Sequence, residues 1–114
     1  MDKYLLALLG EAGATGLAKG IYIVRKEERF HEAYLNELSH WEYFKQFRRS
    51  LLEKPVYLLL LILGVVVGAM GKRVIRLVVN KVEEQALDFY YKNFEIKGEI
   101  SKIVEDEKKH FIEY

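Results

Sequence analysis

The sequence predicts an all-α fold: a bundle of four helices with an extra hydrophobic crossover helix from about Val56 to Met70. No stretch alternates cleanly between apolar and polar residues with the period of two that marks strands, and the apolar positions recur at helical spacing. The chain also contains only one proline, Pro55, so little interrupts long helices. At 114 residues we expect a single domain, residues 1–114.

The charge and cysteine content exclude several classes of function. Lys and Arg number 18 and Asp and Glu number 17, so the net charge of +1 does not favour a nucleic-acid partner. The absence of cysteine excludes a disulfide framework, a thiolate zinc site and a rubredoxin-type iron centre. Residues 4–9 superficially resemble the start of a signal peptide. Because Glu11 interrupts this apolar run, we expect a helix that stays in the protein.

The first predicted helix runs from about Asp2, a candidate N-cap, to about Val24. Its four glycines lower helix propensity by up to ~1 kcal/mol each, so tight packing must hold it. Glu11 is the only acid between Lys3 and Lys19, and its helical neighbours carry no charge. A buried carboxylate there must be protonated, partnered or bound to a cation. The alternatives are a solvent-facing Glu11 or a pairing with a lysine such as Lys19.

The second predicted helix covers roughly Lys26 to Leu52 and contains two Glu-x-x-His pairs. Glu37 and His40 share a face with an apolar stripe, so this pair points inward. The stripe comprises Phe30, Ala33, Tyr34, Trp41, Phe44, Phe47 and Leu51. Glu28 and His31 form the second pair. Nine residues at about 100° each place Glu28 half a turn from Glu37, so we interpret this second pair as surface residues.

Pro55 is expected to end the second helix and to start the third at its first position. The next fifteen residues, 56–70, carry no charge. As a helix these fifteen residues span only ~22 Å, whereas about 20 residues, or ~30 Å, are needed to cross a bilayer comfortably. Gly64 and Gly68 are spaced for close helix contact. The segment fits a buried crossover helix, a dimer face or a helix dipping into one leaflet. Nearby basic residues suit an anionic membrane surface or simply solubilise the helix ends.

Two further helices complete the prediction. Gly71 breaks the chain, and a helix follows from about Lys72 to Phe94. On this helix Glu83 shares an apolar face with Tyr90, which is a candidate neighbour of the ligands, whereas Glu84 lies on a solvated edge. The last helix runs from about Lys97 to the C-terminus. There Glu107 and His110 lie on the apolar side, and Asp106 is assigned to the surface together with Glu105, Lys108, Lys109 and Glu113.

The inward carboxylates and histidines form a repeated pattern: Glu, then Glu-x-x-His, twice. The six candidate metal ligands are Glu11, Glu37, His40, Glu83, Glu107 and His110. The intervals of 26 residues from Glu11 to Glu37 and 24 from Glu83 to Glu107 each allow a helix, a turn and a helix back to the same level. This set is typical of di-iron or di-manganese carboxylate bundles. Four carboxylates and two imidazoles suit two iron ions, with manganese as the alternative.

Segments along nearly the whole chain carry motifs of one known family. They are Gly10–Ala14, Glu37 with His40 and Phe44, Arg48–Leu52 with Pro55, Gly68–Lys72, Val82–Glu84 with Tyr90, and Glu107 with His110. Together they resemble the di-iron demethoxyubiquinone hydroxylases of ubiquinone biosynthesis, within the ferritin-like di-iron carboxylate superfamily. The resemblance implies a ferritin-like four-helix di-iron bundle. It also implies that Glu11 and Glu83 are terminal ligands, that Glu37 and Glu107 bridge, and that His40 and His110 each cap one iron.

The function that the resemblance implies is a monooxygenase that hydroxylates a quinone ring with dioxygen. The hydrophobic third helix would then face a membrane or a lipid-soluble quinone-like substrate, and the protein would be cytoplasmic, peripheral to the inner face of the cell membrane. Three alternatives stay open: a rubrerythrin-like peroxidase or oxidase acting on peroxide or dioxygen, a ferritin-like iron-binding protein, and a small membrane-associated bundle without metal. A homo-oligomer is compatible with each.

Overall fold

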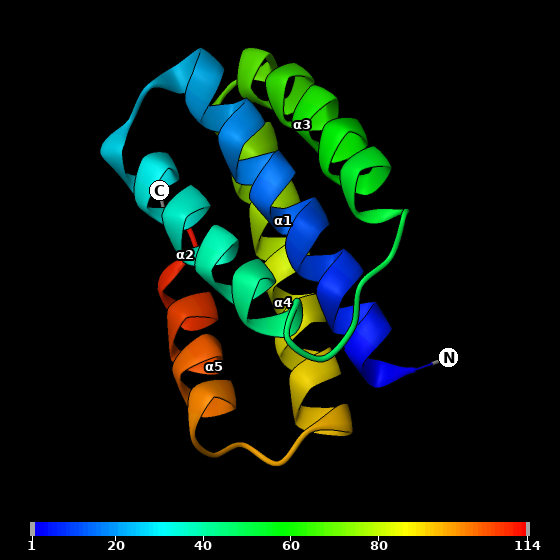
Figure 1. The fold of residues 1–114 in the computed structure, drawn as a ribbon. Helices are drawn as coiled ribbons and strands as arrows, with labels where there is room; N and C mark the ends of the chain where they lie inside the picture. The colour runs from blue at the N-terminus through cyan, green and yellow to red at the C-terminus, as the bar shows by residue number, and fades with distance from the viewer. Residues whose placement is uncertain (1, 114) are drawn as a thin grey trace.

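The computed structural model describes residues 2–113, and within this range it contains five α-helices and no β-strand. The helices are α1 (Lys3–Arg25), α2 (Glu28–Phe44), α3 (Glu53–Met70), α4 (Lys72–Asn93) and α5 (Glu99–Lys109). Figure 1 shows α1 between α2 and α3, with α4 and α5 as the second pair of helices. The prediction of an all-α chain is confirmed.

Local chemistry sets both ends of α1. Asp2 caps the helix as predicted, because its carboxylate accepts a hydrogen bond of 2.8 Å from the backbone N–H of Tyr4. At the other end Lys26 adopts a left-handed conformation with φ 55°, and its N–H donates to the carbonyl of Tyr22. This left-handed residue ends the helix and lets α2 run back along α1.

The second helix is shorter than predicted, since it ends at Phe44 rather than near Leu52. The segment that follows forms turns, and the buried carboxylate of Glu53 holds them together. Glu53 accepts hydrogen bonds from the backbone N–H of Ser50 at 2.8 Å and from the indole N–H of Trp41 at 2.9 Å. A carboxylate reaching back to the preceding turn thus replaces the two further helical turns that the apolar pattern predicted.

Two other expectations change with this boundary. Phe47 and Leu51, predicted on the buried stripe, are exposed, because the helix that would carry them inward has ended. α3 begins at Glu53, so Pro55 is its third residue rather than its first. Proline is accommodated there because backbone N–H groups of a first helical turn have no acceptor within the helix.

Glycines bring α1 and α3 into direct backbone contact. A Cβ on Gly16 would lie 2.2 Å from the carbonyl oxygen of Tyr57, and one on Gly20 would lie 2.1 Å from that of Leu61. A Cβ on Gly64 would lie 2.4 Å from the carbonyl oxygen of Leu17. No side chain fits at these three positions without moving the backbone, so the close contact predicted for the glycine-rich first helix is present.

The side of α3 that faces away from α1 is apolar and exposed. Its exposed large residues are Leu58, Leu59, Ile62, Leu63, Val66 and Met70. By length and composition α3 is one helix among the described residues that could cross a membrane, and only 22% of its residues are buried within the chain. A core helix of a water-soluble protein would be mostly buried, so α3 has an apolar surface that the rest of the chain leaves uncovered.

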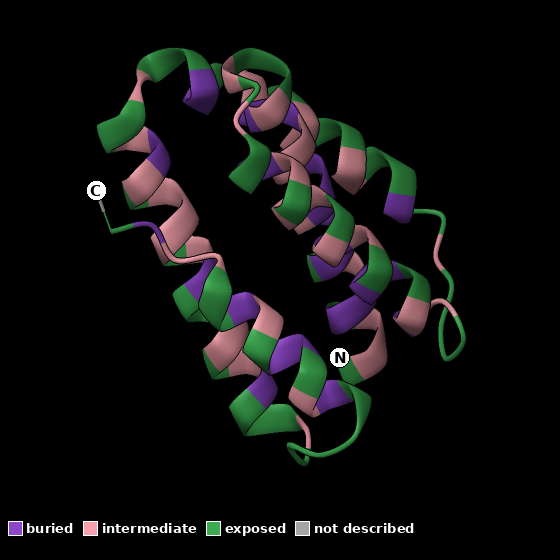
Figure 2. Cartoon of the chain, turned by 90° about the vertical axis from the view of Figure 1, so that its left-hand side faces the viewer, coloured by how far each residue is buried: buried purple, intermediate pink, exposed green. Residues whose placement is uncertain are grey.

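Buried apolar side chains form two clusters, one toward each end of the bundle. The first contains Ala7, Leu8, Ala12, Trp41, Phe44, Tyr90, Ile100, Ile103 and Val104. The second contains Leu17, Ile21, Phe30, Val67, Ile75 and Ile112. In Figure 2 buried residues follow one side of each helix and exposed residues the other. Glu11, Glu37, Glu83 and Glu107 belong to neither cluster, although all four are buried.

Candidate metal centre

The structure brings the six predicted metal ligands together in the interior. The four carboxylates come from four helices: Glu11 from α1, Glu37 from α2, Glu83 from α4 and Glu107 from α5. Each is at most 5% exposed, a degree of burial that ionised side chains avoid unless they are paired or bound to a cation. The carboxylates thus meet at the centre of the bundle.

The ligand atoms form two groups, and within each group all of them lie within 4.8 Å of one another. The first group, here called the His40 position, consists of Glu11, Glu37, His40 and Glu107. The second, the His110 position, consists of Glu37, Glu83, Glu107 and His110. Glu37 and Glu107 belong to both groups, so their carboxylates lie where two neighbouring ions could share them. Each group could hold a metal ion.

Three carboxylates converge on one nitrogen of His40. Its Nδ1 atom lies 3.0 Å from Glu37 Oε1, 3.2 Å from Glu107 Oε1 and 3.4 Å from Glu11 Oε1. His40 lies within α2, three residues after Glu37, so one helical face presents both side chains as predicted. Its other nitrogen, Nε2, donates a hydrogen bond of 2.8 Å to Asp106 Oδ2.

The His110 position is built more loosely. The ring of His110 lies just past the last residue of α5, because the helix ends at Lys109 instead of continuing to the C-terminus as predicted. Its Nδ1 atom is 3.5 Å from Glu83 Oε1, and the side-chain amide of Asn36 contacts its Nε2 at 3.1 Å. The buried His110 therefore depends on its neighbours, rather than on helix geometry, for its placement.

Asn36 and Asp106 are residues of the candidate site that the sequence analysis did not predict. Asp106 was assigned to the solvated surface, but it is half-buried and hydrogen-bonded to His40, so that assignment was wrong. Each of the two residues directly precedes the Glu of a Glu-x-x-His pair and contacts the histidine of the other pair. The shared interval of 70 residues between Asn36 and Asp106, and between the two pairs, was the signal that could have found them. Such outer partners fix the orientation of a metal-binding imidazole.

Tyr90 also contacts the ligands, as the sequence suggested. Its hydroxyl donates a short hydrogen bond to Glu11 Oε2, from α4 across to α1. Burial, and then the nearby charge of Glu11, raise the pKa of Tyr90 well above its ordinary value, so the hydroxyl keeps its proton and remains a donor. This bond leaves the other oxygen of Glu11 facing His40.

The four buried carboxylates cannot all be ionised without a countercharge. Burial, and then the charge of Glu107, raise the pKa of Glu37 well above its ordinary value and also raise the pKa of Glu11. Burial and the hydrogen bond with Glu107 raise the pKa of Glu83 to about 11. Burial opposes the charge of Glu107, but hydrogen bonds from Glu37, His40 and Glu83 lower its pKa to about 2. Protons or metal ions must therefore supply positive charge here.

The two histidines differ in charge for the same reasons. Burial alone would lower the pKa of His40, but hydrogen bonds with Glu107 and Glu11 raise it to about 11. Burial lowers the pKa of His110, which has fewer carboxylate partners. In the metal-free protein His40 therefore carries a proton, which supplies part of the positive charge that the carboxylates need.

The pattern of unpaired atoms fits a metal pair. Among the described residues, seven buried side-chain nitrogen or oxygen atoms make no hydrogen bond of good geometry, and for four of them the contacts are the ion-pair distances around His40 Nδ1. Six of them belong to the six ligands, one atom each: Glu11 Oε1, Glu37 Oε1, His40 Nδ1, Glu83 Oε2, Glu107 Oε1 and His110 Nδ1. Buried polar atoms are normally satisfied, so six such atoms pointing into one region indicate a ligand for them.

The other sequence assignments have mixed outcomes. Glu83 is buried and Glu84 is exposed, so helical phase distinguished them correctly. Glu28 is exposed as predicted. His31 is not a free surface residue, because it is half-buried and its ring lies 5.0 Å from that of Tyr22. The expectation of a surface histidine was therefore wrong for His31, although the residue lies outside both metal positions.

Comparisons of this chain with protein-family models, with curated proteins and with solved structures found no match. Geometry and ligand chemistry therefore carry the functional argument.

Proposed function

We propose that this chain is a ferritin-like di-iron carboxylate oxidoreductase, with the two irons bound at the His40 and His110 positions. The observation that carries the proposal is the set of six buried ligand atoms, one from each ligand, that converge on one region without making a hydrogen bond of good geometry. Four carboxylates balance the charge of two divalent ions, and an oxygen-rich set with two imidazoles suits iron or manganese over thiophilic metals. The arrangement of two Glu and two Glu-x-x-His elements on four helices also matches this class of site.

When bound, such a metal pair supplies redox chemistry with dioxygen or peroxide. The chain's own residues prepare the site for it. Asp106 and Asn36 hold the imidazoles so that Nδ1 of each points inward. Tyr90 fixes one oxygen of Glu11. Burial of the ligands excludes bulk water and strengthens every charge interaction among them.

Within this class we propose a quinone-hydroxylating monooxygenase. The motifs at Gly10–Ala14, Gly68–Lys72 and Val82–Glu84 support this choice within the class, and the exposed apolar face of α3 supports a lipid-soluble substrate. Lys54 precedes this face and Lys72 and Arg73 follow it, which suits attachment to an anionic membrane surface. We therefore propose a cytoplasmic protein at the inner face of the cell membrane.

Metal analysis of protein purified without chelators tests the proposal first. We expect about two irons or manganese ions per chain, in line with the two ligand groups. Glu83→Ala should lose metal, whereas the matched control Glu84→Ala should keep it, because Glu84 is exposed on the same helix. A folded wild-type protein that binds no metal would refute the metal site.

The reaction class needs a separate experiment. Reduced protein is mixed with dioxygen and a short-chain quinone, and NADH consumption is followed with a reductase present. Quinone-dependent consumption and a hydroxylated product support the monooxygenase. Rapid oxidation of the reduced protein by peroxide, without any effect of quinone, supports the rubrerythrin-like peroxidase instead.

A further inference from the structure

We propose that the two metal positions have different access: small, uncharged, largely apolar molecules reach the His110 position through a cavity, while the His40 position is sealed. This inference rests on the proposed metal pair and adds to it which position exchanges ligands. It follows from three observations: the location of the cavity, the packing at the opposite end of the bundle, and a difference in side-chain size between the two repeated helix pairs.

A cavity of about 190 Å³ adjoins the His110 position. The ligands in its wall are Glu37, Glu83 and His110, while Glu11 and His40 take no part in the lining. Engineered apolar cavities of ~150 Å³ bind a molecule the size of benzene, so this cavity has room for a single ring. Molecules in it would meet both ligands that belong to the His110 position alone, Glu83 and His110, together with the shared Glu37.

The walls of the cavity select its ligand by polarity. Leu17, Ile21, Phe30, Val79 and Val82 line it together with several alanines. Asn36 is the polar lining residue that is neither a candidate ligand nor exposed, and its side-chain amide already contacts His110. The charged lining residues Arg29, Glu32 and Lys109 are exposed, which places the opening at the surface. Past these exposed residues the lining other than the ligands and Asn36 is apolar, so a charged molecule loses more hydration on entering than an uncharged one, which is favoured.

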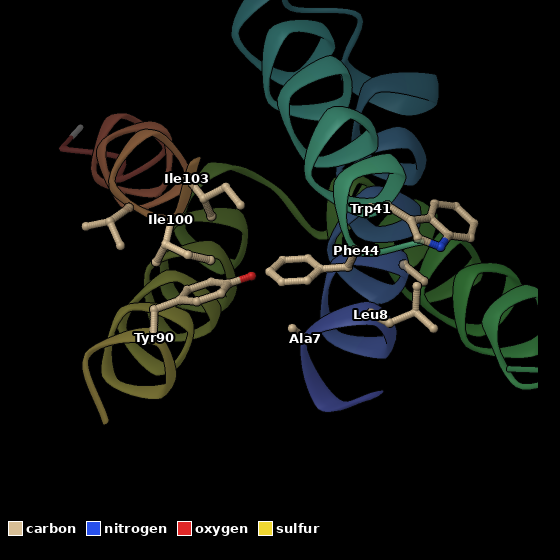
Figure 3. Close-up of a cluster of buried hydrophobic side chains, with 9 residues drawn as sticks. Ala7, Leu8, Trp41, Phe44, Tyr90, Ile100 and Ile103 are labelled. Atoms are coloured by element: carbon tan, nitrogen blue, oxygen red, sulfur yellow. The ribbon is translucent and has the colours of Figure 1, made fainter. Parts of the chain in front are cut away.

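The opposite end of the metal centre is filled by large side chains. Tyr90 from α4 and Phe44 from α2 point toward each other across the bundle, with ring centroids 6.1 Å apart (Figure 3). Leu8 and Trp41 belong to the same buried cluster. The Tyr90 hydroxyl occupies the space directly beside Glu11. Neither the cavity at the His110 position nor a second hollow on the outer side of Trp41, beside Glu53, is lined by Glu11 or His40.

The repeat explains why the two ends differ. Ala18 and Tyr90 occupy equivalent places, each seven residues after the terminal carboxylate of its helix, about two turns along the same face. Ala33 and Ile103 are equivalent too, each four residues before the Glu of a Glu-x-x-His pair. Ala18 and Ala33 line the cavity, whereas Tyr90 and Ile103 belong to the packed cluster. Small residues in the first half thus leave the His110 end open, whereas the equivalent large residues of the second half fill the His40 end.

Phenol is a suitable probe, because it enters as a small neutral ring and, when its oxygen gives up the proton and binds ferric iron, it produces a visible charge-transfer band. We expect one phenol per chain on the diferric protein. When phenol is added to the metal-free protein, the NMR signals of Ala18 and Ala33 should shift. The signals of Ala7, which belongs to the buried cluster around Phe44 and Tyr90, should not. Two phenols per chain, or shifts centred on Ala7, would overturn the inference.

Filling the cavity gives the decisive variant. Ala18→Leu should weaken phenol binding at least tenfold while two metals remain, and the control Ala69→Leu makes the same change at an exposed position on α3 and should leave binding unchanged. Ala33→Leu serves if Ala18→Leu does not fold. Unchanged phenol binding in a folded cavity-filling variant contradicts the inference.

The metal content separates this inference from the proposed function. Two metals per chain without phenol in the cavity would refute the inference alone. Phenol in the cavity of a protein that binds no metal would refute the metal function and leave the cavity as a ligand site.

Discussion

The two ends of the candidate metal centre present the same kinds of ligand in different settings. At one end His40 lies inside α2, surrounded by three carboxylates and hydrogen-bonded to the charged Asp106. At the other, His110 lies beyond the end of α5, beside the neutral amide of Asn36 and an apolar cavity. A repeated ligand pattern therefore does not make two equal sites. The ligands at one end are enclosed by carboxylates and large side chains, and those at the other adjoin a cavity with room for a further molecule.

The largest effect should come from removing the Tyr90 side chain, which fills the His40 end of the candidate metal centre. Tyr90→Ala removes a buried ring and should lower the free energy of unfolding by about 3–5 kcal/mol, the range for large aromatic truncations. It should also make the ends alike, so that the folded diferric protein binds two phenols. Urea denaturation and a phenol titration measure the two effects.

The control for this variant is Tyr90→Phe. It keeps the ring and loses only the hydrogen bond to the buried carboxylate of Glu11, so it should cost about 2–3 kcal/mol and leave phenol binding at one per chain. If Tyr90→Phe and Tyr90→Ala bind phenol alike, the ring does not seal the His40 position.

The next effect concerns the outer partners of the histidines. Asp106→Ala should lower metal affinity at the His40 position about 10- to 100-fold, as is typical for residues that orient a metal-binding imidazole. Asn36→Ala should act at the His110 position, and more weakly, because a neutral amide polarises the ring less than a carboxylate does. Metal competition titrations that resolve the two binding steps compare the variants. Equal losses in both steps from either variant would argue against separate partners.

The pH dependence of the metal-free protein should be opposite to that of a protein with ordinary carboxylates. Glu83 changes its pKa from 4.5 to about 11 on folding, and His40 changes its pKa from 6.5 to about 11. The folded state therefore binds more protons than the unfolded chain across this range, and stability must fall as the pH rises through it. Glu107 acts in the opposite sense, but its contribution is lost only as the pH falls from 4.5 toward about 2.

Urea midpoints at about pH 6 and about pH 9, with and without metal, measure this dependence. The urea midpoint of the metal-free protein should be lower at about pH 9 than at about pH 6. Metal ions replace the bound protons and should remove the decline. A metal-free protein that becomes more stable at the higher pH would show that the carboxylates ionise without help.

The smallest effect should come from Asn80, whose side chain forms a clamp of two hydrogen bonds on the backbone of Ile112. Asn80 accepts a hydrogen bond of 2.8 Å from the backbone N–H of Ile112 and donates one of 2.9 Å to its carbonyl. Asn80→Ala removes both and should cost about 1–2 kcal/mol, mostly in local opening near His110. Hydrogen exchange should rise at residues 110–112, and metal should dissociate faster from the His110 position alone. Faster loss from both positions would mean that the clamp supports the whole centre.

The sequence was most informative where burial follows helical phase. Phase distinguished Glu83 from Glu84 and turned Glu28 outward, because an apolar stripe determines which side of a helix faces the interior. It did not reveal Asp106 or Asn36, since each lies at the edge of its stripe, where a polar residue is equally compatible with solvent. It also placed the end of α2 too late. That boundary depends on Glu53 reaching back to Ser50 and Trp41, a tertiary contact that apolar spacing does not encode.

The access difference was beyond sequence reasoning for another reason. Ala18 and Ala33 are unremarkable helix residues, and only the packing of the helices around them shows that their small side chains leave a cavity, while the equivalent Tyr90 and Ile103 are packed at the other end. A void depends on what neighbouring helices fail to fill, so it appears only when the packing is known.

The backbone contact between α1 and α3 has a consequence for evolution. Because Gly16, Gly20 and Gly64 dock the two helices main chain to main chain, the position of α3 depends little on its outward side chains. Substitutions on the outer face, at positions such as Leu59 and Ile62, can therefore accumulate without shifting Glu11 on the neighbouring helix. The exposed face of α3 can therefore change in evolution without changing the buried candidate ligands. Related sequences could carry a different outer surface around the same six side chains.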